Sequence, residues 1–357
     1  MNKDRKLYLS ATGMLTAVGD SAEMTAASVK AGISGFEVSE YKNQQDENIT
    51  MAGMPQSIYD EFAIEFGVEG DNSKHYNRII KMALMAITQV FKRQPVDTHI
   101  PLILAIPENL PNISNISPKT LVARLIDQAK LPIDPEQIRH VHTGRAAGIH
   151  SLDLAERFLY DQELDYVLVG GSDSYWDDSV ISYLNKTDRA KAPGAIDAFI
   201  PGEGAGFLLL TRHPEKALIV DDHIIALCPA GVAQESGHMY SDQPYRGDGL
   251  SQAVQQALKD YQGAGIHSVY SSMNGEHYWS KEYGVAMTRN HSHFKEDVIH
   301  QHHADCYGDL GAATGTVLIG LAAENLRKIK GPASHLVYSS SDNAWRAALR
   351  VEKIPLA

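Results

Sequence analysis

The chain of 357 residues has a formal net charge of −12, and 43% of its residues are apolar while 21% are charged. This balance predicts an enzyme-sized globular protein and excludes the disordered and fibrous classes. A broadly acidic chain without a concentrated basic patch disfavours nucleic acid and anionic membranes as partners. We therefore expect neither nucleic-acid binding nor membrane insertion.

The cysteine content and the N-terminus indicate the compartment. Only two cysteines occur, Cys228 and Cys306, so no disulfide framework is implied and a reducing compartment is favoured. The N-terminus lacks the apolar segment of a signal peptide, and no run of about 18 apolar residues could cross a bilayer. We therefore expect a soluble, cytoplasmic protein.

Short apolar runs alternate with helical patterns along the chain. Strands are predicted at residues 6–12, 101–106, 166–171, 206–211, 268–273, 335–340 and 347–354. Several of these runs are apolar on both faces, as is typical of strands covered by helices on each side. Helices are predicted at residues 21–32, 77–91, 251–261 and 316–329. This alternation indicates an α/β fold.

Residues 142–150, HTGRAAGIH, have the shape of a strand-to-helix elbow that usually presents a nucleophile, and a helix-like run follows them. The residue at the tip is Arg145, whose guanidinium stays protonated and is no nucleophile. A cation at a helix N-terminus is disfavoured by about 0.3–1 kcal/mol unless an anion lies beside it. We therefore expect a carboxylate near Arg145.

Five segments, in colinear order, resemble the β-ketoacyl synthases of the thiolase superfamily. One of them, DAFIPGEGAGFLLLTR at 197–212, is similar to the family pattern DGFVxGEGAGxLVLE almost residue for residue. The others are residues 11–36, 165–174, 233–258 and 307–328. The resemblance implies a five-layer α-β-α-β-α sandwich of two similar halves, generally a homodimer. We place the halves at residues 1–215 and 216–357, in one compact unit.

The same resemblance locates the family's active-site positions. Active members use a cysteine at a helix N-terminus to accept an acyl group, and two further residues, His with His or Asn, assist decarboxylation. Matched motif by motif, Arg145 takes the place of the cysteine, and Asn274 and Asp309 take the other two positions. A glycine-rich loop of the family falls on residues 338–346, which have no glycine. Candidate pocket residues are Arg145, Asn274, Glu276, Asp309, Ser340 and Ser341.

These substitutions predict a charge pair in the former catalytic cavity. An arginine beside an aspartate can form a bidentate, charge-assisted pair, so we expect Arg145 to meet Asp309 or Glu276. The pair would either form part of a pocket for a small polar ligand or fill the old cavity. The sequence thus predicts a pseudoenzyme without condensing activity and without a cofactor. It would act as a homodimer, or with an acyl-carrier protein or an active ketosynthase as its partner.

Two alternatives involve other residues. The first is an acyltransferase of fatty-acid or polyketide type that uses Cys306 or Ser340 as its nucleophile. The second is a metal-dependent hydrolase, because an H-x-H pattern on a strand puts two imidazoles on one face, where they could hold zinc. Its weak candidate ligands are His291, His293, His300 and His302, within a segment that continues through His303. The corresponding segment of the family holds no metal, so we expect none.

Two glycine-rich motifs are also expected to form a defined local structure. GGSDS at 170–174 and GEGAG at 202–206 lack the features of a nucleophile elbow or a phosphate-binding loop. We predict both as tight turns in which glycine permits a close backbone approach.

Overall fold

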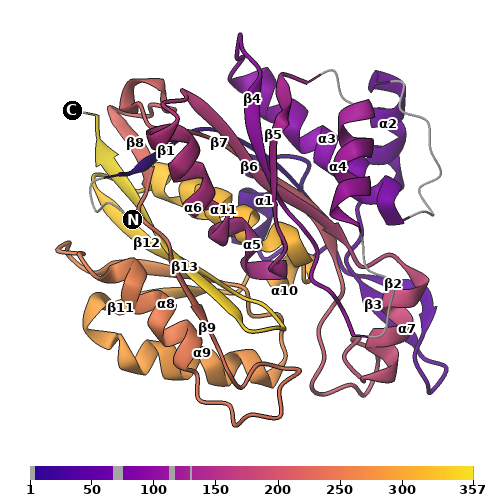
Figure 1. Cartoon of the computed structure of the whole chain (residues 1–357). Coiled ribbons are helices and arrows are strands. Elements are labelled where there is room, and N and C mark those ends of the chain that lie inside the picture. Colours follow the sequence, from indigo (N-terminus) through magenta and orange to yellow (C-terminus); the bar gives the residue numbers. More distant parts are fainter. Residues whose placement is uncertain (1–4, 67–74, 112–116, 129–130, 357) are drawn as a thin grey trace.

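A computed structural model describes residues 5–66, 75–111, 117–128 and 131–356 (Figure 1). In this part of the chain, the strands form one large mixed sheet and a separate hairpin. The N-terminal half of the large sheet consists of β1 (Leu7–Thr16), β4 (Ile100–Ala105), β5 (Ile133–Val141), β6 (Tyr166–Ser174) and β7 (Glu203–Thr211). The C-terminal half consists of β8 (His223–Leu227), β9 (Gly231–Gln234), β10 (Ile266–Ser271), β11 (Phe294–Gln301), β12 (Ala333–Ser340) and β13 (Trp345–Pro355).

The two halves of the sheet repeat the same strand order. With the short β9 left aside, the orders are β1-β7-β6-β4-β5 and β8-β13-β12-β10-β11, which correspond strand for strand. The directions correspond as well, because β4 and β10 are each parallel to both of their neighbours. The remaining pairs within each half are antiparallel. Two residue pairs between β1 and β8 join the halves. This repeat is the internal similarity expected of the thiolase fold, while the boundary between residues 215 and 216 stays a prediction.

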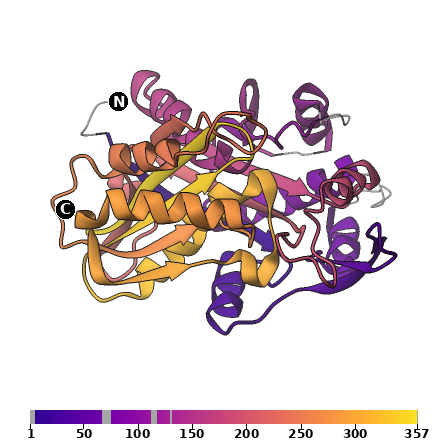
Figure 2. The same ribbon diagram turned by 90° about the horizontal axis from the view of Figure 1, so that it is seen from below.

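Helices lie on both faces of the sheets. They are α1 (Ala22–Lys30), α2 (Gln56–Phe66), α3 (His75–Arg93), α4 (Pro118–Gln128), α5 (Ala147–His150), α6 (Leu152–Glu156), α7 (Asp178–Lys186), α8 (Asp248–Leu258), α9 (His277–Arg289), α10 (Ala304–Tyr307) and α11 (Thr314–Lys328). The hairpin of β2 (Glu37–Lys42) and β3 (Asn48–Met51) packs against α7 at one side of the molecule (Figures 1 and 2). Within the described residues, no helix is long and apolar enough to cross a membrane.

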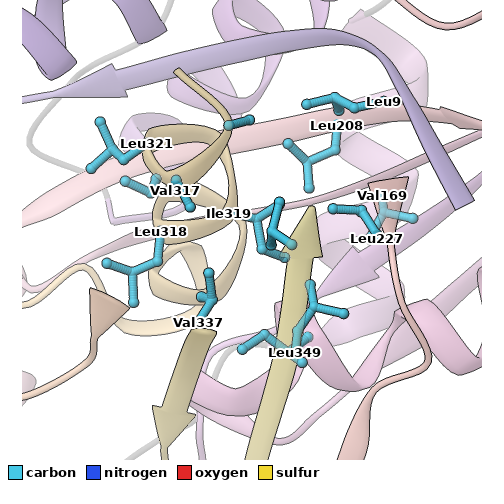
Figure 3. Close-up of a cluster of buried hydrophobic side chains, with 14 of the residues drawn as sticks. Leu9, Val169, Leu208, Leu227, Val317, Leu318, Ile319, Leu321, Val337 and Leu349 are labelled. Atoms are coloured by element: carbon cyan, nitrogen blue, oxygen red, sulfur yellow. The ribbon is translucent and has the colours of Figure 1, made fainter. Parts of the chain in front are cut away.

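Alternating side chains on the strands build the layers. On β7, Leu208 and Leu210 face the central layer, whereas Phe207 and Leu209 join the outer core with α3. On β12, Val337 faces the centre and Leu336 faces the outer core with α8. This two-residue period is that of strands buried on both faces. Figure 3 shows α11 in the central layer, where its apolar side chains meet those of both halves of the large sheet. The predicted five-layer fold class is confirmed.

The prediction that GGSDS and GEGAG form tight turns is wrong. Residues 170–174 belong to β6, and residues 203–206 begin β7. Glycine is required there because the central layer lies very close to the strands. A Cβ at Gly171 would be 2.5 Å from the carbonyl oxygen of Ala312, and one at Gly206 would be 2.9 Å from the backbone nitrogen of Val317. The close approach was predicted correctly, but it occurs in strands.

All seven predicted strands and all four predicted helices are present, with ends within four residues of those expected. Strand β5 was missed because its sequence, IDPEQIRHV, is polar and contains a proline. Both features suit the position of β5 at the edge of the sheet, where one side of the strand has no ladder partner among the residues that the structure describes. The short β8 was missed because its apolar run follows a charged turn without a clear break.

Two helical glycines provide a test of the central packing. A Cβ at Gly148 in α5 would lie 2.8 Å from the backbone nitrogen of Thr316 in α11, whereas a Cβ at Gly284 in α9 would meet nothing within 4 Å. We expect Gly148→Ala to lower the free energy of unfolding by about 1–3 kcal/mol through overpacking. The matched Gly284→Ala change should raise it by about 0.5–1 kcal/mol through helix propensity. Urea denaturation measures both, and equal stability of the two variants would contradict the close contact of α5 with α11.

Candidate functional site

The turn after β5 places Arg145 inside the protein. Gly144 has φ +57°, and Gly144–Ala146 form a single 3-10 turn that leads directly into α5. A Cβ at Gly144 would lie 2.6 Å from a carboxylate oxygen of Glu108, so glycine is required for space as well as for conformation. The predicted elbow is therefore present, and the side chain at its tip is only 3% exposed.

Each nitrogen of the Arg145 guanidinium donates to an oxygen of the C-terminal half. Nε donates to the carbonyl of Ser340 at 2.8 Å, Nη1 to Asp309 at 2.6 Å and Nη2 to Asp342 at 2.5 Å. The guanidinium also lies over the ring of Trp279, 4.5 Å from its centroid. The predicted pair of Arg145 with Asp309 is thus present, and a second carboxylate, from Asp342, accompanies it.

Asp309 is held by four groups. Besides Arg145, it accepts hydrogen bonds from Nδ2 of Asn274 at 2.8 Å, from the backbone N–H of Gly311 at 2.8 Å and from the hydroxyl of Tyr175 at 3.3 Å. Asn274 and Asp309 were predicted to occupy one site, and the structure brings them together. Charge-assisted bonds of this kind fix the carboxylate in one orientation.

A second arginine completes the cluster. Arg189, in the loop after α7, donates two hydrogen bonds to Glu276 at 2.6 and 2.9 Å and two to Asp342 at 2.6 and 3.2 Å. Glu276, the other predicted partner of Arg145, is therefore bound to Arg189 instead. Asp342 lies between the two guanidinium groups and also accepts from the hydroxyl of Tyr240 at 2.8 Å.

The electrostatics follow from this arrangement. Burial alone would raise the pKa of Asp342, but the guanidinium groups of Arg189 and Arg145 lower it below its ordinary value. Glu108 accepts the backbone N–H groups of Asp342 and Asn343, and burial, with the nearby charge of Asp342, raises its pKa to about 7. Burial likewise raises the pKa of Asp173 to about 7. The two arginines are thus balanced by carboxylates of the chain itself.

The two candidate serines have different contacts. Ser341 accepts the backbone N–H of Ala146 at 3.0 Å and donates to the carbonyl of Thr143, so it holds the turn on which Arg145 lies. The hydroxyl of Ser340 donates to Glu282, which is also paired with Arg346. Burial raises the pKa of Glu282, while the charge of Arg346 opposes that effect.

Cys306, the other alternative nucleophile, lies in the apolar central core. Burial, with the neighbouring charge of Asp305, raises the pKa of its thiol. A buried thiol with a raised pKa is a poor nucleophile because little thiolate is present near neutral pH.

The prediction of an H-x-H pattern on a strand is wrong, because His291 and His293 lie on a 3-10 turn before β11. His300 is bonded to the hydroxyl of Tyr283, and Nδ1 of His302 lies 2.7 Å from the hydroxyl oxygen of Ser271. In the part of the chain that the structure describes, no group of three or more His, Cys, Asp or Glu side chains is arranged to hold a metal ion. The metal-dependent hydrolase therefore has no supporting geometry in these residues.

Sequence reasoning missed several members of the cluster, namely Glu108, Tyr175, Arg189, Tyr240, Trp279 and Asp342. A signal for Asp342 was available, because it is the acidic residue in segment 338–346, which the sequence resemblance matches to a glycine-rich loop of the family. Arg189 and Glu108 belong to no motif, and only the packing of separate loops brings them to this place.

Comparison with known proteins agrees with the fold. Residues 139–216, which include Arg145, match the family model described as the N-terminal domain of beta-ketoacyl synthase. No curated protein sequence matches the chain.

Three solved structures are similar over nearly the whole chain. The first is a ketosynthase from module 6 of the bacillaene synthase of Bacillus subtilis 168, with a TM-score of 0.75, 14% identity, and coverage of 97% of this chain and 72% of that one. The ishigamide ketosynthase/chain length factor has a TM-score of 0.73, 15% identity, and coverage of 98% and 99%. A ketosynthase in complex with its chain length factor from Xenorhabdus doucetiae has a TM-score of 0.69, 16% identity, and coverage of 100% and 99%.

The strand order, the five layers, the match over residues 139–216 and the whole-chain structural similarity agree with one another. The chain therefore has the fold of the ketosynthases, and the match to the family model itself is limited to residues 139–216.

Proposed function

We propose that this chain is a non-condensing ketosynthase-like subunit that acts by binding a partner protein. The observation that carries the proposal is Arg145. It stands at the tip of the elbow where the family resemblance puts the nucleophile, and all three of its guanidinium nitrogens are bonded to buried oxygens of the chain. A guanidinium in this state neither attacks a thioester nor removes a proton.

The other two positions support the same proposal. Asn274 and Asp309 stand where the family resemblance puts the residues that assist decarboxylation, and here Asn274 donates to Asp309 while Asp309 accepts from Arg145. An ion-paired aspartate and an amide cannot provide the hydrogen-bond donation and proton transfer of two imidazoles. Arg145, Asn274 and Asp309 would thus form an internal brace, that is, a hydrogen-bonded connection between the N-terminal and C-terminal halves of the chain.

The partner is proposed to be a second thiolase-fold chain, either another copy of this chain or an active ketosynthase. Two of the similar structures contain a chain length factor together with a ketosynthase. A non-condensing chain of the same fold would fit an assembly of that kind. An acyl-carrier protein is the further predicted partner, since active ketosynthases take their acyl groups from it.

The first prediction concerns acyl transfer. When the purified protein is incubated with acetyl-CoA or malonyl-CoA, or with an acylated carrier protein, we expect no covalent adduct, because Arg145 cannot accept an acyl group. Intact-mass spectrometry measures this directly, and an active ketosynthase treated in parallel is the positive control. An acyl adduct that peptide mapping assigned to Cys306 or Ser340 would contradict the proposal and support the acyltransferase alternative.

The second prediction concerns assembly. Sedimentation at micromolar concentration should give the mass of a dimer for the chain alone, or of a one-to-one complex when the chain is co-expressed with an active ketosynthase. The reason is that a chain that catalyses no reaction of its own can act only by contact with another chain. A protein that stays monomeric both alone and with that ketosynthase would count against the proposal.

The third prediction concerns the Arg145 cluster. Arg145→Met leaves Asp309 without its cationic partner and Asp342 with Arg189 alone, and breaking a buried pair costs about 3–5 kcal/mol of unfolding free energy. Adding Asp309→Asn should recover part of that loss, because one uncompensated charge is then removed. Urea denaturation of the single and double variants measures the coupling.

The matched control is Arg289→Met, which breaks a solvent-exposed pair with Asp248. It should change stability by less than about 1 kcal/mol. If Arg145→Met unfolded no more easily than this control, Arg145 would not be the brace that we propose.

A further inference from the structure

A cavity of about 420 Å³ lies at the other end of the C-terminal half. It is found at the start of β10 and β12 and near the end of β13, where Ser334, Arg350 and Glu352 line it. Strand β12 runs from this cavity to Ser340 in the Arg145 cluster, a span of roughly 23 Å at about 3.3 Å per residue. The cavity is therefore separate from the site described above.

Arg350 lines the cavity, and only one of its three guanidinium nitrogens has a short hydrogen bond to a strong acceptor. Its Nε donates to Glu352 at 2.8 Å, but Nη1 has a long contact of 3.4 Å with the carbonyl of Ala257, and Nη2 lies 3.3 Å from the sulfur of Cys228. Sulfur is a weak acceptor, and burial raises the pKa of Cys228 to about 12, so the thiol is neutral. The guanidinium can therefore donate to a stronger, anionic acceptor.

The charge of the lining favours an anion. Glu352 is shared between Arg350 and Lys6, whose Nζ is 2.9 Å away. Lys353 donates to backbone carbonyls at the end of α11, those of Arg327 and Ile329, rather than to a carboxylate. Three cations thus face the two carboxylates of Glu352 and Asp260, a positive excess in a chain whose net charge is −12.

The rest of the lining is largely apolar. The ring of Tyr261 lies 4.9 Å from the Arg350 guanidinium, and Ala264, Pro332 and Ile354 also line the cavity. A concave, mainly apolar site with a few convergent polar groups is the usual form of a small-molecule site, and such sites have volumes of about 300–1,000 Å³.

We propose that this cavity binds a small organic anion. Its phosphate or carboxylate group accepts hydrogen bonds from Arg350 and Lys6, and its apolar body lies against Tyr261. The binding adds to the partner function proposed above and does not depend on it, because the two sites lie at opposite ends of β12 and share no residue.

Calorimetric titration of the full chain with phenyl phosphate, benzoate and inorganic phosphate tests the proposal. At least one of the two aromatic anions should bind saturably, and inorganic phosphate should bind more weakly because it cannot pack against Tyr261. The anion that binds more tightly identifies the head group.

The variants Lys6→Gln and Ala264→Trp test the location. The first removes a cation, and the second puts a large ring at the exposed edge of the cavity without changing its charge. Each should weaken binding at least tenfold, which corresponds to about 1.4 kcal/mol. Arg350→Gln should abolish binding. Because Arg350 is buried, a loss of binding in Arg350→Gln does not separate a lost ligand contact from a disturbed fold. The location of the site is therefore decided by Lys6→Gln and Ala264→Trp, which change side chains that reach solvent.

Arg289→Gln is the matched control, because it removes a surface cation that does not line the cavity. Its affinity should equal that of the wild type. The proposal is overturned if neither aromatic anion binds the wild type saturably, or if Lys6→Gln and Ala264→Trp both bind as the wild type does.

Discussion

A buried guanidinium governs the arrangement of this protein. Arg145 is nearly inaccessible, and a charge in such a place is tolerated only when opposite charges and hydrogen-bond acceptors surround it. Its acceptors all come from the C-terminal half, namely Ser340, Asp309 and Asp342, whereas Arg145 itself follows β5 of the N-terminal half. One side chain therefore connects loops of the two halves of the chain.

The remaining charges are arranged around the same constraint. Asp342 neutralises Arg145 and Arg189 together, and Arg189 in turn fixes Glu276. Networks of this kind are favourable only when nearly every member has a partner, since a half-satisfied buried network costs more than an apolar core. The loss of one charge would consequently affect several loops, and this supports the proposal that the cluster has a structural role.

The sequence predicted the parts of this cluster that lie in recognisable motifs. Arg145 and Asp309 were found because each stands at a defined place in a pattern, and an unpaired cation at a helix start requires an anion. Arg189 could not be found, because it lies in a loop without a motif and meets Asp342 only through tertiary packing. Local propensity predicts turns for the glycines of GEGAG, because it does not reveal that α11 passes beside β7. The strands and central helix were predictable because burial on both faces leaves a strong apolar signal.

The same residue type has two different environments at the two ends of β12. At one end, all three guanidinium nitrogens of Arg145 donate to oxygens at 2.5–2.8 Å, so its charge is balanced by acceptors of the chain itself. At the other end, Arg350 has one carboxylate, a long carbonyl contact and a thiol, and it lines a cavity. Chemical identity and burial are similar in both cases, so the quality of the acceptors distinguishes a structural arginine from one able to bind a ligand. By that criterion, the elbow at Arg145 is the less promising place to look for a ligand of this chain.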